Sequence, residues 1–171
     1  GAGTHFSVGG NPYTAAPEAM SATPHAFSRR LRELYHGFVQ LRSLVTPVLG
    51  AVHGTLVGGA FAGCLHTDRL VAEQGSIFEH GNLIRGVCPL GMLSKTFAAA
   101  LGAHAQHVYL RNARATAAEA HAFGLVHQIC KTVGVTKARA HSVAELLATD
   151  RLLVAAFRER RAPVEVAHIA R

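Results

Sequence analysis

The sequence predicts a layered α/β fold built around a single core, and two observations support this prediction. Short apolar segments typical of strands alternate along the chain with segments of helical periodicity. Hydrophobic residues make up 49% of the 171 residues, which is enough for one sizeable core but not for two ordinary domains. We therefore expect one core domain over residues 1–150, followed by a C-terminal helix and tail over residues 151–171.

The N-terminal half begins with a short extended segment, "THFSV", and a loop rich in Pro, Ala and Ser over residues 11–24. From about His25, apolar residues recur at spacings of three and four, which predicts one stripe of an amphipathic helix that Pro47 ends. The next segment, "PVLGAV", is fully apolar and predicts a strand buried on both faces. The residues of the predicted helical stripe are Phe27, Leu31, Leu34, Phe38, Leu41 and Leu44.

The following segments continue the alternation. "GGAFAGCLHT" predicts a short helix of small residues, and "DRLVAE" and "SIFEH" predict two short strands. "TAAEAHAFG" predicts a helix with Thr116 as N-cap, Glu119 at the capping-box position and Gly124 closing it. "LVHQI" predicts a strand. Further helices are expected in "PLGMLSKTFAAALG", "AQHVYL", "HSVAELLA" and "RLLVAAFRERR".

Charge and cysteine content narrow the function classes. The net charge is +7 and the isoelectric point is about 10.0, which favours anionic partners. However, there is no Trp, no Lys/Arg run interleaved with aromatics and no Cys/His finger spacing, so we expect no nucleic-acid partner. No apolar run approaches the about 18 residues of a membrane span, so we expect no membrane partner. The three scattered cysteines favour an intracellular location, either the cytoplasm or an organelle matrix.

The stretch "HGTLVGGAFAGC", residues 53–64, predicts a turn from a buried strand into a helix. A main chain with little side-chain bulk lets a backbone N–H approach a developing oxyanion to about 3 Å. The alternative interpretation of Gly58 and Gly59 is close packing of a strand against a helix. One helical turn further on lie Phe61, Ala62 and Gly63, none of which can carry out proton chemistry.

Three segments in order resemble the crotonase (enoyl-CoA hydratase/isomerase) superfamily: "GAGTHFSVGGN", the block from "LRSLVTPVLGAVHG" to "SIFEHG", and "YLRNARATAAEAHAFGLVHQI". The resemblance covers roughly residues 1 to 130. It implies a crotonase-like (ClpP/crotonase) layered ββα superhelix, here lacking its N-terminal strands, so we expect the chain to be a processed or truncated piece. It also implies a homotrimer or hexamer.

The resemblance further implies binding of an acyl thioester, carried by coenzyme A or by the phosphopantetheine of an acyl carrier protein. No other cofactor and no metal are implied. Two backbone N–H groups would stabilise the enolate oxyanion, and by motif position these belong to Val8 and Gly59. The residues expected to line the substrate site are Gly9, Gly58, Ala62, Asn82 and Pro89.

Two positions depart from the hydratases of this superfamily. Their first catalytic carboxylate lies three residues after the oxyanion glycine, which here is Ala62, and their second falls on Asn82. Hydration needs a positioned acid–base pair, which neither Ala nor neutral Asn can supply. The sequence therefore argues against a standard hydratase.

Three interpretations stay open. The first is a lyase, because decarboxylation of a malonyl- or glutaconyl-type thioester generates the enolate directly. The decarboxylases of polyketide β-branching also lack both glutamates, but they use a Lys in the loop where this chain has "NPYTAAPEAM". The second is an isomerase with a displaced acid–base group. The third is an inactive homologue with a structural or assembly role.

His80 is the first candidate for the displaced group, because it precedes Asn82 on the segment expected to line the pocket. Its alternative is a structural histidine. Glu79 is expected to face away from His80 in an extended segment. His66 is expected to be a packing or C-cap group, and Glu119 a capping carboxylate.

Basic side chains near the expected thioester region offer one further prediction. Arg29, Arg30 and Arg32 could contact the phosphates of coenzyme A or a carrier's phosphopantetheine arm. A solvated helix face is the competing interpretation. Cys88, in "GVCPLGML", is expected to be a small buried thiol rather than a nucleophile.

Overall fold

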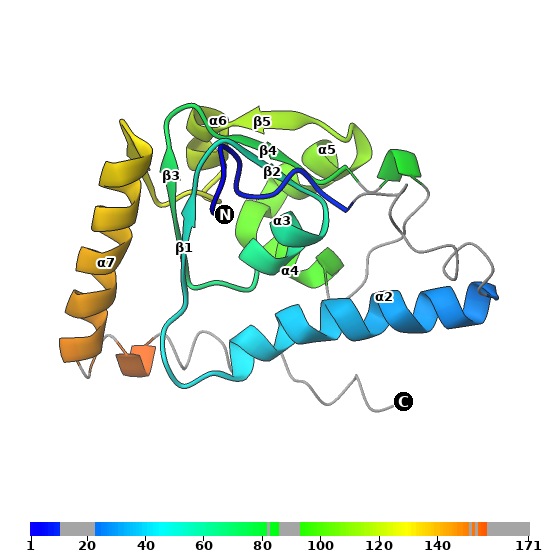
Figure 1. Cartoon of the computed structure of the whole chain (residues 1–171), viewed down its shortest axis with the longest axis horizontal. Helices are drawn as coiled ribbons and strands as arrows, with labels where there is room; N and C mark the ends of the chain where they lie inside the picture. The colour runs from blue at the N-terminus through cyan, green and yellow to red at the C-terminus, as the bar shows by residue number, and fades with distance from the viewer. Residues whose placement is uncertain (11–22, 82, 86–92, 151, 153, 157–171) are drawn as a thin grey trace.

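The computed structural model describes residues 1–10, 23–81, 83–85, 93–150, 152 and 154–156. Within these residues, two three-stranded sheets lie side by side, with helices packed around them (Figure 1). This arrangement confirms the predicted α/β class. Asn82, Cys88 and Pro89, together with the loop predicted over residues 11–22, lie outside the described residues.

The first sheet has the order β1-β3-β6 and is parallel throughout. Its strands are β1 (Leu49–Val52), β3 (Arg69–Glu73) and β6 (Gln128–Cys130). Helix α7 (Val133–Thr149) packs against all three strands along one flank of the molecule (Figure 1). The expectation of a strand at residues 47–52 buried on both faces holds only in part, because exposure alternates along β1.

The second sheet has the order β2-β4-β5 and carries the candidate site. Strands β2 (Thr55–Val57) and β4 (Ile77–Glu79) are parallel, and β5 (Arg114–Thr116) is antiparallel to β4. The N-terminal segment runs parallel to β2 on its other side. Ser7 N donates to Thr55 O at 3.0 Å, and Val57 N donates to Ser7 O at 2.9 Å.

The helices enclose a core of apolar side chains contributed by both sheets. Helix α2 runs along one edge of the molecule and packs against α3 (Figure 1). Helices α4 and α5 pack against each other. The bounds are α2 (Pro24–Val39), η1 (Gln40–Ser43), α3 (Gly59–Cys64), η2 (Leu83–Arg85), α4 (Leu93–Leu101), η3 (Gly102–His104), α5 (Ala105–Leu110) and α6 (Ala117–Ala122).

The predicted apolar stripe of α2 is wrong in part. Leu34 is 56% exposed and Leu44 is 47% exposed, whereas Tyr35 and Val39 are buried. Tyr35 and Val39 lie one helical turn apart and therefore share the inward face. The α-helix gives way to a 3₁₀ turn at Gln40, which changes the angular period before Leu44 is reached.

Two strands were not expected from the sequence, namely β2 and β5, each only three residues long. Helix α7 was expected to start near residue 141 but begins at Val133, where the Thr132 side chain accepts a hydrogen bond from Val135 N at 3.3 Å. It ends at Thr149. None of the helices among the described residues combines the length and the apolar character needed to cross a bilayer.

Candidate active site

The glycine turn joins β2 to α3 and is the first part of the site. Gly58 is the N-cap of α3, with φ 66° and ψ −125°, a conformation that only glycine adopts without strain. Its N–H donates to Glu79 O at 3.1 Å. The turn is therefore fixed to the end of β4, and the next residue, Gly59, starts the helix.

Neither backbone conformation nor packing requires glycine at position 59. Its φ is not positive, and a Cβ added there would meet Phe38 and the Tyr35 hydroxyl only at 3.8 Å, an ordinary contact distance. By contrast, a Cβ at Gly63 would lie 3.1 Å from the Phe38 ring, so Gly63 is required by helix packing. The Gly59 amide donates no hydrogen bond to any described residue.

Val8 lies on the segment beside β2, close to the same turn. Ser7 pairs with β2, and Gly9, with φ 92°, follows Val8; a Cβ added at Gly9 would lie 3.4 Å from Val57 Cγ1. The Val8 side chain is 66% exposed, and within the described part of the chain its amide donates no hydrogen bond. The amides of Val8 and Gly59 therefore lie at the ends of two adjacent parallel segments.

His80 follows β4 directly and is fully buried. Its ring contacts three aromatic rings, with centroid distances of 6.4 Å to Phe61, 5.4 Å to Phe97 and 5.1 Å to Tyr109. Neither ring nitrogen has a hydrogen-bond partner in the described structure. Burial lowers the pKa of His80 from 6.5 to about 4, so the imidazole is neutral at pH 7.

Comparison with known proteins identifies the family. The sequence matches the family described as "Enoyl-CoA hydratase/isomerase" over residues 1–168. The chain belongs to the enoyl-CoA hydratase/isomerase family. It is thus a member of the crotonase superfamily, as the three sequence segments indicated. No curated protein sequence matches the chain at a significant level.

Solved structures support the same fold. An enoyl-CoA hydratase from Polaromonas sp. JS666 superimposes with a TM-score of 0.83 at 24% identity, covering 99% of this chain and 66% of that one. A probable enoyl-CoA hydratase/isomerase from Mycobacterium abscessus gives 0.78 at 23% identity, covering 98% and 65%. An enoyl-CoA hydratase/isomerase from Cupriavidus metallidurans CH34 gives 0.75 at 23% identity, covering 90% and 57%. The chain therefore spans less than two thirds of the length of these proteins.

Within this family, the position expected for the first hydratase carboxylate is occupied by Ala62. Ala62 is 1% exposed and belongs to the hydrophobic core. Its methyl group packs on the inner face of α3 and offers no acid–base chemistry. The second expected position, Asn82, and the expected lining residue Pro89 lie outside the described residues, so both stay predictions.

The carboxylate of Glu79 is engaged away from His80. Arg114 Nε lies 3.2 Å from Glu79 Oε2, across the pair of strands β4 and β5. The Glu79 carboxylate meets the exposed Arg114, whereas the His80 ring packs against Phe97 and Tyr109, so the two side chains do not converge. The prediction that Glu79 faces away is confirmed.

The other titratable residues considered as candidates are buried groups or helix caps. His66 is buried just beyond the C-terminal end of α3, at the opposite end from Gly59. Glu119 forms the predicted capping box with Thr116, and hydrogen bonds from the backbone and side chain of Thr116 lower the pKa of its carboxyl group. Burial raises the pKa of the Cys64 thiol to about 12, which leaves it unreactive at neutral pH.

Sequence reasoning missed the aromatic surroundings of His80. Phe61 comes from α3, Phe97 from α4 and Tyr109 from α5, and no local spacing links them. Their contacts are formed only when the three helices pack around the end of β4. No sequence signal short of the fold itself would have found this cluster.

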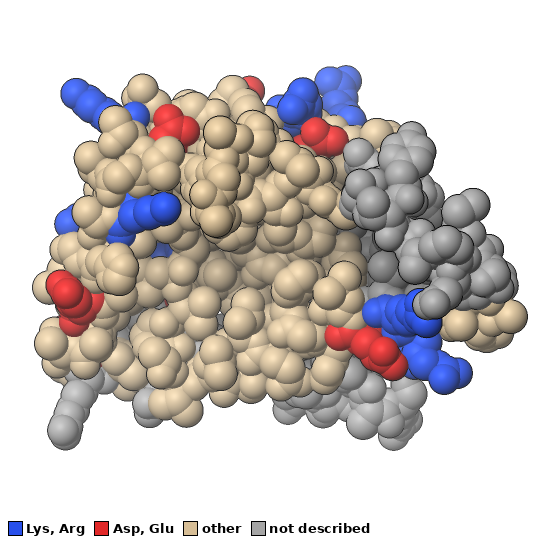
Figure 2. Space-filling view, viewed as in Figure 1, with Lys and Arg blue, Asp and Glu red and all other residues tan. Residues whose placement is uncertain are grey.

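The arginines of α2 stay candidates for phosphate contacts. Arg29, Arg30 and Arg32 are all exposed. On the face drawn in Figure 2, charged side chains lie near the rim, and Lys or Arg side chains lie beside an acidic group close to α2. The exposed Glu33 lies on the same helix, so both the phosphate contact and the solvated face are compatible with this surface.

Proposed function

We propose that this chain binds an acyl thioester and stabilises its enolate oxyanion with the backbone N–H groups of Val8 and Gly59. The carrier is coenzyme A or the phosphopantetheine arm of an acyl carrier protein. One observation carries the proposal: the Gly59 amide has no partner among the described residues, and neither packing nor conformation requires glycine there. A ligand oxygen that accepts a hydrogen bond from this amide would supply the partner that the described residues lack.

The reaction that suits this site is a lyase or isomerase reaction rather than hydration. In a decarboxylation, the bond between the α-carbon and the carboxylate breaks, CO₂ leaves, and the electron pair passes into the thioester enolate. The oxyanion hole then supplies the main stabilisation, and a single proton returned to the α-carbon completes the reaction. In an isomerisation, His80, whose ring nitrogens are unbonded in the described structure, is the proposed base: its neutral imidazole takes a proton from one carbon of the acyl group and returns the same proton to another.

An inactive homologue with an assembly role is the second candidate. Ala62 in place of a carboxylate favours it, and so does the complete burial of His80. A homotrimer or hexamer would suit this role as well as the catalytic one. Ligand binding separates the two candidates, because an assembly subunit has no need of an accessible Gly59 amide.

The test is turnover of malonyl-CoA, methylmalonyl-CoA and 3-methylglutaconyl-CoA, followed as CO₂ loss by mass spectrometry. The matched variants are Gly59→Pro and Gly59→Ala. Proline is tolerated at the first position of a helix and replaces the N–H by a ring carbon, whereas alanine keeps the N–H and its Cβ fits the available space. We expect the proline variant to lose about 100- to 1,000-fold in kcat and the alanine variant to stay within a few-fold.

Two results would contradict the proposal. If the wild-type chain neither turns over nor binds any of the thioesters, the glycine turn is inherited architecture and the assembly role is favoured. If Gly59→Ala and Gly59→Pro lose the same activity, the amide is not the functional group.

A further inference from the structure

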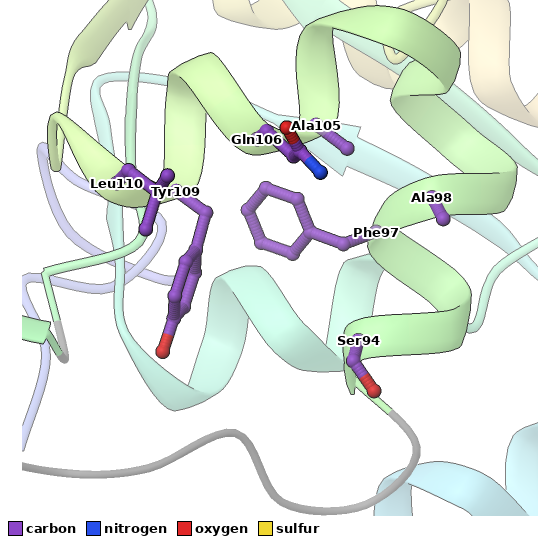
Figure 3. Close-up of a pocket in the computed structure, with 7 residues that line it drawn as sticks. All are labelled: Ser94, Phe97, Ala98, Ala105, Gln106, Tyr109 and Leu110. Atoms are coloured by element: carbon purple, nitrogen blue, oxygen red, sulfur yellow. The ribbon is translucent and has the colours of Figure 1, made fainter.

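Two pockets of the described structure differ in the charge of their walls. The pocket between α4 and α5 has no charged side chain in its described lining. Figure 3 shows its walls, where the Phe97 ring points from α4 toward α5 with the Tyr109 ring beside it. A second pocket, of about 220 Å³, lies between α7 and the strands β3 and β6. We call it the α7 pocket, and its lining combines apolar side chains with the two cations Arg69 and Arg139.

The floor of the α7 pocket is apolar. Four residues of α7 line it at spacings that place them on one face of the helix, namely Arg139, Val143, Leu146 and Leu147. Val71, from β3, is 2% exposed and completes the floor together with the buried Leu147. Leu146 is 59% exposed, although an apolar side chain of this size gains by leaving water. A hydrocarbon group placed on this floor would therefore be stabilised by covering Leu146.

The two guanidinium groups of the α7 pocket come from different elements. Arg69 is the first residue of β3, on the same face of the strand as Val71, and Arg139 lies on α7. Gln128, the register partner of Val71, accepts a hydrogen bond from Arg139 Nε at 2.8 Å, which restrains the guanidinium. Arg139 forms no ion pair with a residue that the structure describes. No carboxylate belongs to the described lining, so the pocket presents positive charge beside an apolar floor.

We infer that the α7 pocket binds a short aliphatic monocarboxylate, with its carboxylate at Arg69 and Arg139 and its hydrocarbon chain on the apolar floor. The planar guanidinium group matches a carboxylate with paired hydrogen bonds. An uncharged hydrocarbon would desolvate the cations without offering them a partner, and a small inorganic anion would leave Leu146 in water.

The size and place of the pocket define the ligand further. Its volume of about 220 Å³ corresponds to roughly seven groups the size of a water molecule, which suits a chain of roughly four to eight carbon atoms. The pocket lies on the first sheet, whereas Gly59 follows β2 of the second sheet. The inference therefore goes beyond the proposed function and does not depend on it.

Binding of hexanoate, acetate and hexanol to the full chain at pH 7, measured by calorimetry, tests the inference. Each buried methylene strengthens binding roughly fourfold, so hexanoate is expected to bind about tenfold or more tightly than acetate. Hexanol has a similar chain without the charge. It is expected to bind about tenfold or more weakly than hexanoate, because hydrogen bonds between charged groups are the stronger ones.

Variants of α7 test the two parts of the pocket separately. Arg139→Gln removes one cation and is expected to weaken hexanoate binding about tenfold. Leu146→Gln removes part of the apolar floor and is expected to reduce the difference in affinity between hexanoate and acetate.

Lys137→Gln is the matched control. It removes the same charge from the same helix, but the exposed Lys137 lines a different pocket, beside Pro47 and Leu49. Because salt screens an exposed charge at a distance, we expect hexanoate affinity to stay within about twofold of the wild type.

Four results would overturn the inference. The first is the absence of saturable hexanoate binding, and the second is equal affinity for hexanoate and hexanol, since the cations would then play no part. The third is an equal loss in Arg139→Gln and Lys137→Gln, because hexanoate would then respond to the overall charge of the chain. The fourth is loss of binding in Ala98→Phe, which fills the α4–α5 pocket of Figure 3 and leaves both arginines in place.

Discussion

The N–H of Gly58 donates to the carbonyl oxygen of Glu79 at 3.1 Å, and this bond joins the two halves of the candidate site. On one side lies Gly59, with its unbonded amide. On the other lies His80, the residue after Glu79. Because a main-chain hydrogen bond holds the two segments together, a change at the glycine turn is expected to affect the position of His80 as well.

Gly58→Ala tests how far the site depends on this turn. The φ of 66° with ψ −125° is a conformation that an alanine adopts only with strain, which costs about 1–3 kcal/mol. We expect chemical denaturation to show a loss of unfolding free energy in this range, together with weaker acetyl-CoA binding. Gly59→Ala, one residue on, serves as the control and is expected to change stability by less than Gly58→Ala does. Equal losses in the two variants would contradict the special role of the Gly58 conformation.

Local patterns predicted those parts of the structure that local physics determines. The capping box formed by Thr116 and Glu119 was readable because its two hydrogen bonds connect residues three positions apart. The apolar strand ending at Val52 and the glycine turn were readable for the same reason. The strands β2 and β5 were missed, because segments of three residues are stabilised by their neighbours in the sheet rather than by their own periodicity.

In the candidate site, too, some features were predicted from local sequence and others depend on tertiary packing. The proposed donor positions Val8 and Gly59 came from motif position, and in the structure Val8 follows a segment that pairs with β2 while Gly59 follows β2 at the start of α3. The aromatic rings around His80 were missed, since their contacts depend on how three helices pack. For the same reason, the sequence could not show that His80 would be buried without a hydrogen-bond partner.

The capping box gives a prediction about stability alone. In Thr116→Ala the Glu119 amide loses its side-chain acceptor, and we expect a cost of about 1 kcal/mol in unfolding free energy. Because the pKa of Glu119 is lowered in the folded state, its contribution is present above its unfolded pKa and is lost as the pH falls through the folded pKa. Glu119→Gln is therefore expected to flatten the acid end of the stability curve, below the pH range in which histidines titrate. Unchanged acid unfolding in Glu119→Gln would contradict this assignment.

Glu79→Gln distinguishes a structural carboxylate from a catalytic one. Glu79 pairs with Arg114, whose side chain is 66% exposed, so loss of this pair is expected to cost less than about 1 kcal/mol. We expect thioester binding and turnover to stay within a few-fold of the wild type, because the carboxylate faces away from His80. A loss of turnover comparable to that of Gly59→Pro would show that the Glu79 carboxylate takes part in the reaction and is not merely structural.

His80 gives a prediction in a different pH window. Its folded pKa of about 4 lies below the unfolded value of 6.5, so the unfolded chain takes up a proton that the folded chain does not. The contribution of neutral His80 to the free energy of unfolding is therefore fully present above pH 6.5. It is lost as the pH drops toward 4, by about 3 kcal/mol over the whole window. His80→Leu removes the titrating group and both unbonded nitrogens. We expect this variant to be at least as stable as the wild type at pH 7 and to lose less stability between pH 7 and pH 5.

A second histidine variant makes this result specific. His107→Leu removes an exposed imidazole from α5 and is expected to keep the wild-type loss of stability between pH 7 and pH 5. If His80→Leu loses as much stability as the wild type over that interval, the assignment of His80 as a buried neutral imidazole is wrong.

His80→Leu also tests the proposed proton transfer, because a purely structural His80 can be replaced without loss of turnover once the fold is intact. We expect His80→Leu to bind acetyl-CoA normally and to turn over at least about 100-fold more slowly, the range over which a positioned acid–base group acts.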